Sequence, residues 1–287
     1  MLSYGIQPDV LILRTEKHLD DQMRMKVAGF CNVDLECVIQ SEDLPSIYEV
    51  PVNMQRQGLD SAILRKMGIP VGETPALGPW HKFLELRRSA SETVRIGMVG
   101  KYDLQDAYKS ISESLSHAAT YNKRKVEITF INSEFLTSDN IAEKLSEQDG
   151  LVICPGFGTR GIEGKILAAQ YARTHNVPCF GICLGMQMMV IEFARNVLGY
   201  ADANSSEMDN ATPHNVIDMM EDQKNISNMG GTMRLGAYEC ELVKGSRVAA
   251  IYNKEVVSER HRHRYEFNNA YIKEFEAAGM KCAGRNP

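Results

Sequence analysis

The sequence has no apolar run long enough to cross a membrane, although 44% of its 287 residues are hydrophobic. A membrane-spanning helix needs about 20 mainly apolar residues, so we expect none. The chain also has no excess of positive charge, because its formal net charge is −5, and general nucleic-acid binding is not expected. The N-terminal residues lack the basic segment and the cleavage site of a signal peptide. We therefore expect a cytoplasmic protein.

The sequence has no Cys-x-x-Cys pair, and its 7 cysteines are scattered. An odd number of scattered cysteines indicates free thiols in a reducing compartment rather than a disulfide framework. The same spacing argues against a zinc site. No metal ligand is predicted anywhere in the chain.

What the sequence does contain is a regular alternation of apolar segments and helical patterns. A buried strand is predicted over residues 8–14 and a helix over 22–31. From residue 94 to 198, four predicted strands alternate with four helices through short connections, which predicts a parallel sheet covered on both faces. A Pro- and Gly-rich stretch at residues 71–80 separates these two parts, and we place the boundary near residue 92.

One cysteine differs from the others in its setting. Cys183 lies where a predicted buried strand meets a helix, with Gly181 and Gly185 close by. Small residues permit a tight turn there, as in the nucleophile elbow of hydrolases. A helix N-terminus should also lower the pKa of the thiol. Taken alone, the segment fits a reactive cysteine and a buried structural one about equally well.

A glycine loop precedes this segment. Residues 154–161 follow a predicted buried strand and contain three glycines and Arg160. Glycines let backbone N–H groups approach an anion closely, so a ligand loop is favoured over a plain turn. Residues 230–236 form another glycine-rich loop, which is weak evidence by itself.

A basic segment occupies residues 259–266. If it is one strand, its three arginines lie on one face and its two histidines on the other. Arginine is well suited to binding a carboxylate through two hydrogen bonds. A solvated, charged edge strand remains the alternative.

Together, these motifs resemble the CTP synthase family over essentially the whole chain. GICLGMQ (181–187), CPGFGTRGIEGK (154–165), GGTMRLG (230–236) and ERHRHRYE (259–266) resemble its class I glutamine amidotransferase domain. GIQPDVLILR (5–14), AGFCNV (28–33), SIYEVP (46–51), and IGMVGKY (96–102) with DAYKS (106–110) resemble the end of its synthetase domain and the junction.

This resemblance implies an α/β fold with two domains. Residues 1–75 would be the tail of a P-loop-type α/β synthetase domain, residues 76–92 a linker, and residues 93–287 a parallel-sheet class I glutamine amidotransferase domain. The implied reaction is the ATP-dependent amination of UTP to CTP with ammonia from glutamine. Magnesium accompanies ATP, GTP activates glutamine hydrolysis, CTP inhibits, and the full-length enzyme is a homotetramer.

The resemblance also implies roles for individual residues. Cys183 matches the nucleophile. The positions matching glutamine and oxyanion binding are Gly156, Leu184, Gln187, Glu207 and Arg264. Those matching the GTP-linked lid are Phe157 and Arg160, and those matching nucleotide binding are Lys26 for UTP or CTP and Arg14 and Leu44 for ATP.

Two family motifs are missing from the 287 residues. There is no GxxxxGK[ST] phosphate loop, and no late His-x-Glu motif that supplies the rest of the catalytic triad. His261 and His263 belong to the basic segment and are not substitutes. We interpret the chain as part of a longer enzyme and expect little glutamine turnover from it alone. Two alternatives remain: a stand-alone class I glutaminase subunit, and a non-catalytic glutamine-binding or regulatory domain.

Overall fold

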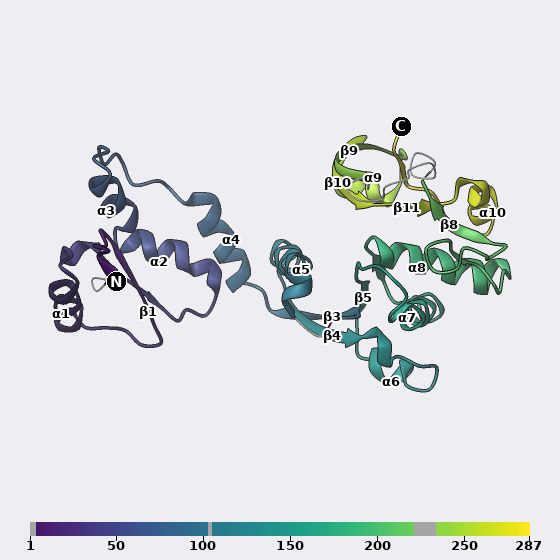
Figure 1. Cartoon of the computed structure of the whole chain (residues 1–287), viewed down its shortest axis with the longest axis horizontal. Helices are drawn as coiled ribbons and strands as arrows, with labels where there is room; N and C mark the ends of the chain where they lie inside the picture. Colours follow the sequence, from purple (N-terminus) through teal and green to yellow (C-terminus); the bar gives the residue numbers. More distant parts are fainter. Residues whose placement is uncertain (1–3, 103–104, 221–233) are drawn as a thin grey trace. The chain divides into compact units, whose positions relative to one another are not determined.

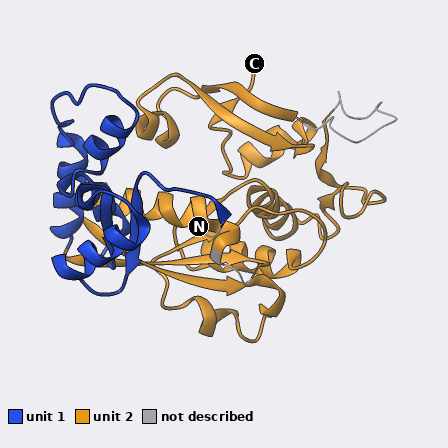
Figure 2. Ribbon diagram, turned by 60° about the vertical axis from the view of Figure 1, so that its left-hand side comes forward, with its two compact units in different colours: residues 1–90 blue, residues 91–287 orange. Residues whose placement is uncertain are grey.

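The computed structural model describes residues 4–102, 105–220 and 234–287. The chain divides into two compact units, residues 1–90 and residues 91–287, called unit 1 and unit 2 below (Figure 2). Within the described ranges, none of the helices combines the length and the apolar character that a membrane span requires.

Unit 1 contains a parallel pair of strands and several helices (Figure 1). Its elements are β1 (Leu11–Thr15), α1 (Asp21–Cys31), β2 (Val38–Glu42), α2 (Val50–Arg56), α3 (Leu59–Lys66) and α4 (Gly78–Arg88). Asp20 begins α1, because its carboxylate accepts a hydrogen bond from the Met23 N–H at 2.7 Å. Helix α4 lies in the segment expected to be a linker, and Trp80 on it donates from Nε1 to the Tyr48 carbonyl at 2.8 Å.

Unit 2 is built on a sheet of parallel strands in the order β4-β3-β5-β6 (Figure 1). The elements of this part are β3 (Glu92–Gly100), α5 (Lys109–Tyr121), β4 (Arg124–Asn132), α6 (Ile141–Leu145), β5 (Gly150–Ile153), α7 (Ile162–Thr174), β6 (Cys179–Gly181) and α8 (Leu184–Phe193). A helix lies between each strand and the next, and such a crossover connection allows successive strands to run parallel.

Helices cover both faces of this sheet. On one face, Val99 and Leu151 pack with Ala168 of α7 and with Leu145 of α6. On the other, Met98 and Val152 belong to a core that includes apolar residues of α5. Successive residues of β3 and β5 thus point to opposite faces and are buried on both. The predicted α/β fold with a parallel sheet is confirmed.

The described residues in the rest of unit 2 form two smaller sheets and two short α-helices. One sheet has the order β11-β8-β7, the other β10-β9-β12. The elements are β7 (Asn204–Ser205), β8 (Asn215–Met219), β9 (Arg234–Leu242), α9 (Arg247–Tyr252), β10 (Val256–His263), β11 (Tyr265–Phe267), α10 (Ile272–Ala277) and β12 (Gly284–Arg285). Most of the 230–236 glycine loop, residues 230–233, lies outside the described residues.

Residues 259–266 do not form one strand. Strand β10 ends at His263 and pairs with β9, whereas β11 begins at Tyr265 and pairs with β8 in another sheet. Within β10 the predicted alternation holds, because Arg260 and Arg262 are exposed while the two histidines are half-buried. Arg264 lies at the junction and leaves the face that the other two arginines share.

Candidate active site

Cys183 occupies a sharp turn between β6 and α8. Its backbone has φ 53° and ψ −111°, a conformation that is strained for a residue with a side chain. A Cβ on Gly181 would lie 2.6 Å from the backbone carbon of Gly185, and one on Gly185 would lie 2.0 Å from the carbonyl oxygen of Ile153. Only glycine fits at both positions, so the predicted strand-to-helix elbow is present.

The thiol of Cys183 is not made more acidic by its surroundings. The residue is exposed, yet the protein atoms around the thiol desolvate it, and this raises its pKa above the ordinary value. The backbone N–H of Leu184 donates to the thiol and lowers the pKa, Glu207 raises it, and Lys165 lowers it. Because desolvation is the largest of these effects, the expected lowering at the helix N-terminus is outweighed.

The glycine loop of residues 154–161 joins β5 to α7 beside this turn. A Cβ on Gly156 would lie 3.3 Å from Cδ2 of Leu184, the first residue of α8. The N–H of Gly158 donates to Oε1 of Glu207 at 3.2 Å. The loop, the elbow and the segment after β7 are therefore brought together by contacts between the loop backbone and the side chains of Leu184 and Glu207, which the sequence does not reveal.

Gln187 and Arg264 approach the same place from α8 and from the junction of β10 and β11. Nε2 of Gln187 donates to the carbonyl of Tyr265 at 3.3 Å. Its Oε1 is buried and has no hydrogen-bond partner among the described residues. The pKa of Tyr265 is raised mainly by burial, with further effects from Glu207 and Arg264. A free buried acceptor beside an acid and an arginine is suited to a polar ligand.

The two lid positions lie further along the loop. Phe157 is exposed, and the ammonium group of Lys101 lies 4.5 Å from the centre of its ring and donates to its carbonyl. Arg160 forms an ion pair with Glu134 at 2.6 Å and lies over Tyr102. Lys101 and Tyr102 were not predicted as site residues. Their position directly after β3, at the carboxyl edge of the sheet, was the available signal.

In unit 1, the predicted nucleotide-binding residues Arg14, Leu44 and Lys26 are not joined by hydrogen bonds or ion pairs among the described residues. Arg14 forms an ion pair with Asp43 and donates to the carbonyl of Ser41 at 3.3 Å. Leu44 follows Asp43 directly, whereas Lys26 is exposed on α1. Arg14 is thus paired with the residue that precedes Leu44, and the placement of Lys26 with them remains a prediction.

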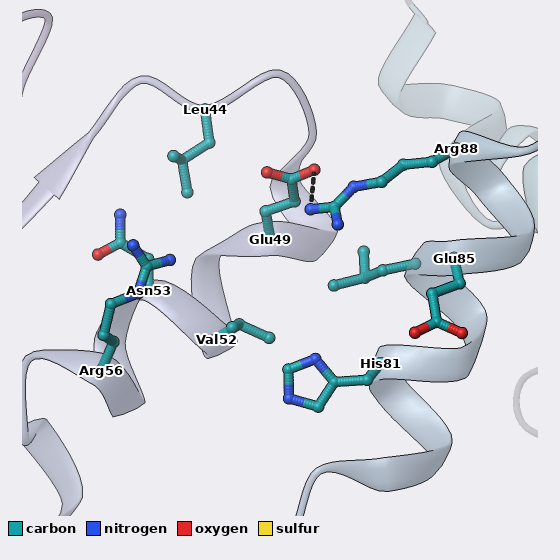
Figure 3. A pocket seen from close by; sticks show the side chains of 9 residues that line it. Leu44, Glu49, Val52, Asn53, Arg56, His81, Glu85 and Arg88 are labelled. Carbon is teal, nitrogen blue, oxygen red and sulfur yellow. Dashed lines mark hydrogen bonds and ion pairs between the residues drawn. The ribbon is translucent and has the colours of Figure 1, made fainter.

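Leu44 also lines a cavity of about 230 Å³ in unit 1 (Figure 3). The cavity lies between α2 and α4 and carries charges of both signs. Arg88 and Glu49 form an ion pair there at 3.0 Å, and Arg56, His81 and Glu85 contribute further polar groups. Mixed charge of this kind does not by itself identify a ligand.

Comparisons with known proteins agree with this geometry. A family model described as glutamine amidotransferase class-I matches residues 103–287, and one described as CTP synthase N-terminus matches residues 1–69. CTP synthases of Bacteroides fragilis and Bacteroides thetaiotaomicron are 67% and 66% identical over 99% of this chain. The chain spans 54% and 53% of these proteins, about half of their length.

A solved structure is also similar. It is described as the glutaminase domain of Trypanosoma brucei CTPS with bound acivicin, and it is 40% identical to this chain with a TM-score of 0.64. The similarity covers 68% of this chain and 75% of that one. The N-terminal family model, the relatives and this structure give the same assignment, and the amidotransferase model is compatible with it. The chain belongs to the CTP synthase family.

Proposed function

We propose that unit 2 binds glutamine and that Cys183 is its nucleophile. In this reaction the thiolate attacks the carboxamide carbon, ammonia leaves, and a thioester remains that water then hydrolyses. The observation that carries the proposal is the elbow. The strained backbone of Cys183 and the two glycines that exclude any Cβ hold a thiol at the end of a buried sheet, and such strain is found at functional sites.

Backbone donors near the thiol suit the negative charge that develops during attack. The N–H of Leu184 already donates to the thiol. We assign this group and Gly156 to the oxyanion, because preformed donors at a helix N-terminus stabilise such a charge strongly. The side-chain carboxamide oxygen of glutamine, which becomes the oxyanion, would accept these hydrogen bonds.

The other end of glutamine carries a carboxylate and an ammonium group. We assign Arg264 to the carboxylate, since a guanidinium group can bind it through two hydrogen bonds. Glu207 and the free Oε1 of Gln187 are acceptors suited to the ammonium group. The acivicin bound in the similar trypanosomal structure supports a ligand site in this type of domain.

Turnover also needs a group that takes and returns a proton. In the part of the chain that the structure describes, the groups that shift the thiol pKa are Leu184, Glu207 and Lys165, and none is a histidine. We therefore expect this chain to react with an activated glutamine mimic but to release ammonia from glutamine slowly. Rapid ammonia release that is lost in Cys183→Ala would contradict this expectation.

For the whole protein, we propose the amination of UTP to CTP in the cytoplasm, with ATP and Mg²⁺, in a homotetramer. Family membership is the support. Arg14 and Leu44 would contact ATP and Lys26 the pyrimidine nucleotide. Phe157 and Arg160 would respond to GTP, and CTP would inhibit.

The test is labelling with a diazo-ketone analogue of glutamine, followed by peptide mass spectrometry. We expect labelling at Cys183 that glutamine blocks and that Cys183→Ala abolishes. Cys31→Ala, which removes a half-buried thiol of unit 1, is the matched control and should label normally. A folded protein with no glutamine-protected label at Cys183 would reject the proposed glutamine site.

A further inference from the structure

Lys165 is a buried lysine that the proposed chemistry does not use. It lies on α7 with 0% of its surface exposed, and its Nζ donates to the carbonyl of Cys154 at 2.7 Å. Burying a charged amine is unfavourable unless nearby groups compensate. Lysine is rarely buried so completely in a protein, so its position at this site needs a reason.

The amine lies next to the glycine loop, which approaches the first residue after Cys183. A Cβ on Gly156 would lie 3.7 Å from Nζ of Lys165 on one side and 3.3 Å from Leu184 on the other. Lys165 thus flanks the same glycine as the first residue after Cys183. In the described part of the chain, it is the one side-chain cation among the groups that shift the pKa of the Cys183 thiol.

The charge of Lys165 changes within an accessible pH range. Burial lowers its pKa to about 8. The neighbouring Cys154 and Cys183 thiols oppose this shift when ionised, and the nearby Lys101 adds to it. Lys165 is therefore mainly charged at pH 7 and mainly neutral above pH 9. A cation near a thiol favours the thiolate, and that help is lost as the pH rises through about 8.

We propose that Lys165 is a positioning residue for the nucleophile. Its ammonium group stabilises the thiolate of Cys183, while its hydrogen bond to Cys154 holds the start of the glycine loop. This inference rests on the proposed role of Cys183. A purely structural role would require only the hydrogen bond, which satisfies a carbonyl at the end of β5. The two roles differ in how reactivity depends on pH.

The experiment compares the alkylation of Cys183 by iodoacetamide in the unaltered chain and in Lys165→Met from pH 6 to pH 10. Iodoacetamide is small and neutral and does not need a glutamine site. Peptide mass spectrometry separates Cys183 from the other six cysteines. Below pH 8 we expect Lys165→Met to react about three- to tenfold more slowly, equivalent to roughly half to one pKa unit. Above pH 9 the two rates should converge, because Lys165 is then neutral.

Lys144→Met is the matched control. Lys144 is exposed on α6, so solvent screens its charge, and its loss should leave the profile unchanged. A rate ratio between Lys165→Met and the unaltered chain that stays constant from pH 6 to pH 10 would overturn the proposal, because only the structural role predicts it.

The unaltered chain provides a second test if Lys165→Met does not fold. Its alkylation rate should rise with pH, but the rise should weaken as the pH passes through 8, and by about pH 9 the rate should lie about three- to tenfold below the line extrapolated from lower pH. An uninterrupted rise through pH 8 would reject the coupling. Labelling by the diazo-ketone tests the glutamine site separately. Coupling without glutamine-protected labelling would therefore retain the Lys165–Cys183 interaction and reject the glutamine site.

Discussion

The parallel strands of the two units differ in how completely they are buried. In unit 2, β3 and β5 lie between helices, and Met98, Val99 and Ile153 are at most 1% exposed. In unit 1, β1 has β2 as its single strand partner among the described residues. Ile12 on β1 is 55% exposed, and Phe30 on α1 is 83% exposed. Parallel sheets are stable when both faces are covered. The comparison shows why a strained turn can be held in unit 2.

The candidate residues reflect the same difference. Cys183 and Gly156 lie in the turns that follow buried strands, and Glu207 accepts a hydrogen bond from the N–H of Gly158 in the same glycine loop. Arg14 in unit 1 is held by an exposed ion pair with Asp43, which constrains a side chain weakly. The candidate residues of unit 2 thus lie at the edge of a buried sheet, while those of unit 1 lie on a more exposed framework.

The largest difference between the two units is expected when a glycine on a helix of each unit is replaced by alanine. In unit 2, Gly185→Ala places a Cβ 2.0 Å from the carbonyl oxygen of Ile153. Backbone must move, so we expect a loss of about 3 kcal/mol of stability and loss of labelling at Cys183. In unit 1, Gly29 on α1 has open space, and Gly29→Ala should stabilise by about 0.5–1 kcal/mol.

Denaturant unfolding separates the two effects. Trp80 is the single tryptophan of the sequence and lies in unit 1, so its fluorescence follows that unit. Circular dichroism follows the helices of both units. If Gly185→Ala retained full stability and full labelling at Cys183, the close packing of Gly185 against Ile153 would be contradicted.

The second comparison concerns ion pairs. Arg173 on α7 makes three hydrogen bonds of 2.7–3.1 Å to Glu192 on α8, whose side chain is only 3% exposed. Arg173→Met leaves that carboxylate buried without its cation and should cost about 2 kcal/mol. Arg65→Met breaks the exposed pair with Glu36 in unit 1 and should cost about 0.5 kcal/mol or less. If urea unfolding showed that Arg173→Met and Arg65→Met lose the same free energy of unfolding, the expected difference between the buried and the exposed ion pair would be contradicted.

The sequence predicts the central sheet of unit 2 well, because its signals are local. Strands β3 and β5 belong to the alternation of strands and helices that is predicted from residue 94 onward. Apolar runs and short connections suffice for such strands. The spacing of Gly181 and Gly185 around Cys183 likewise predicts the elbow, since both glycines act within one turn.

Features that depend on distant partners were not predictable in this way. The basic segment divides at Arg264 because Tyr265 pairs with Met219, far away in the sequence. The thiol pKa depends on how tightly the surrounding chain desolvates Cys183. Lys165 was missed because a lysine on a helix is normally read as exposed, and only the packing of α7 against the glycine loop buries it.

The smallest expected effect comes from the two histidines of β10. Nδ1 of His261 lies 2.8 Å from Nε2 of His263, and Nδ1 of His263 lies 3.1 Å from the Tyr265 carbonyl. Burial is the largest cause that lowers the pKa of each histidine, and Arg234 lowers both further. The unfolded chain therefore binds more protons than the folded one below about pH 6.5, and stability should fall as the pH drops through this range.

We expect the melting temperature followed by circular dichroism to fall by a few degrees between pH 7.5 and pH 5.5. His263→Gln should reduce this dependence, because it removes one titrating group. It also removes the hydrogen bond between the two histidines, which is lost when both rings are protonated. His81→Gln in unit 1 is the matched control, and with it the pH dependence of unit 2 should persist. If His263→Gln melts with the same pH dependence as the unaltered chain, the histidine pair of β10 does not couple protonation to folding.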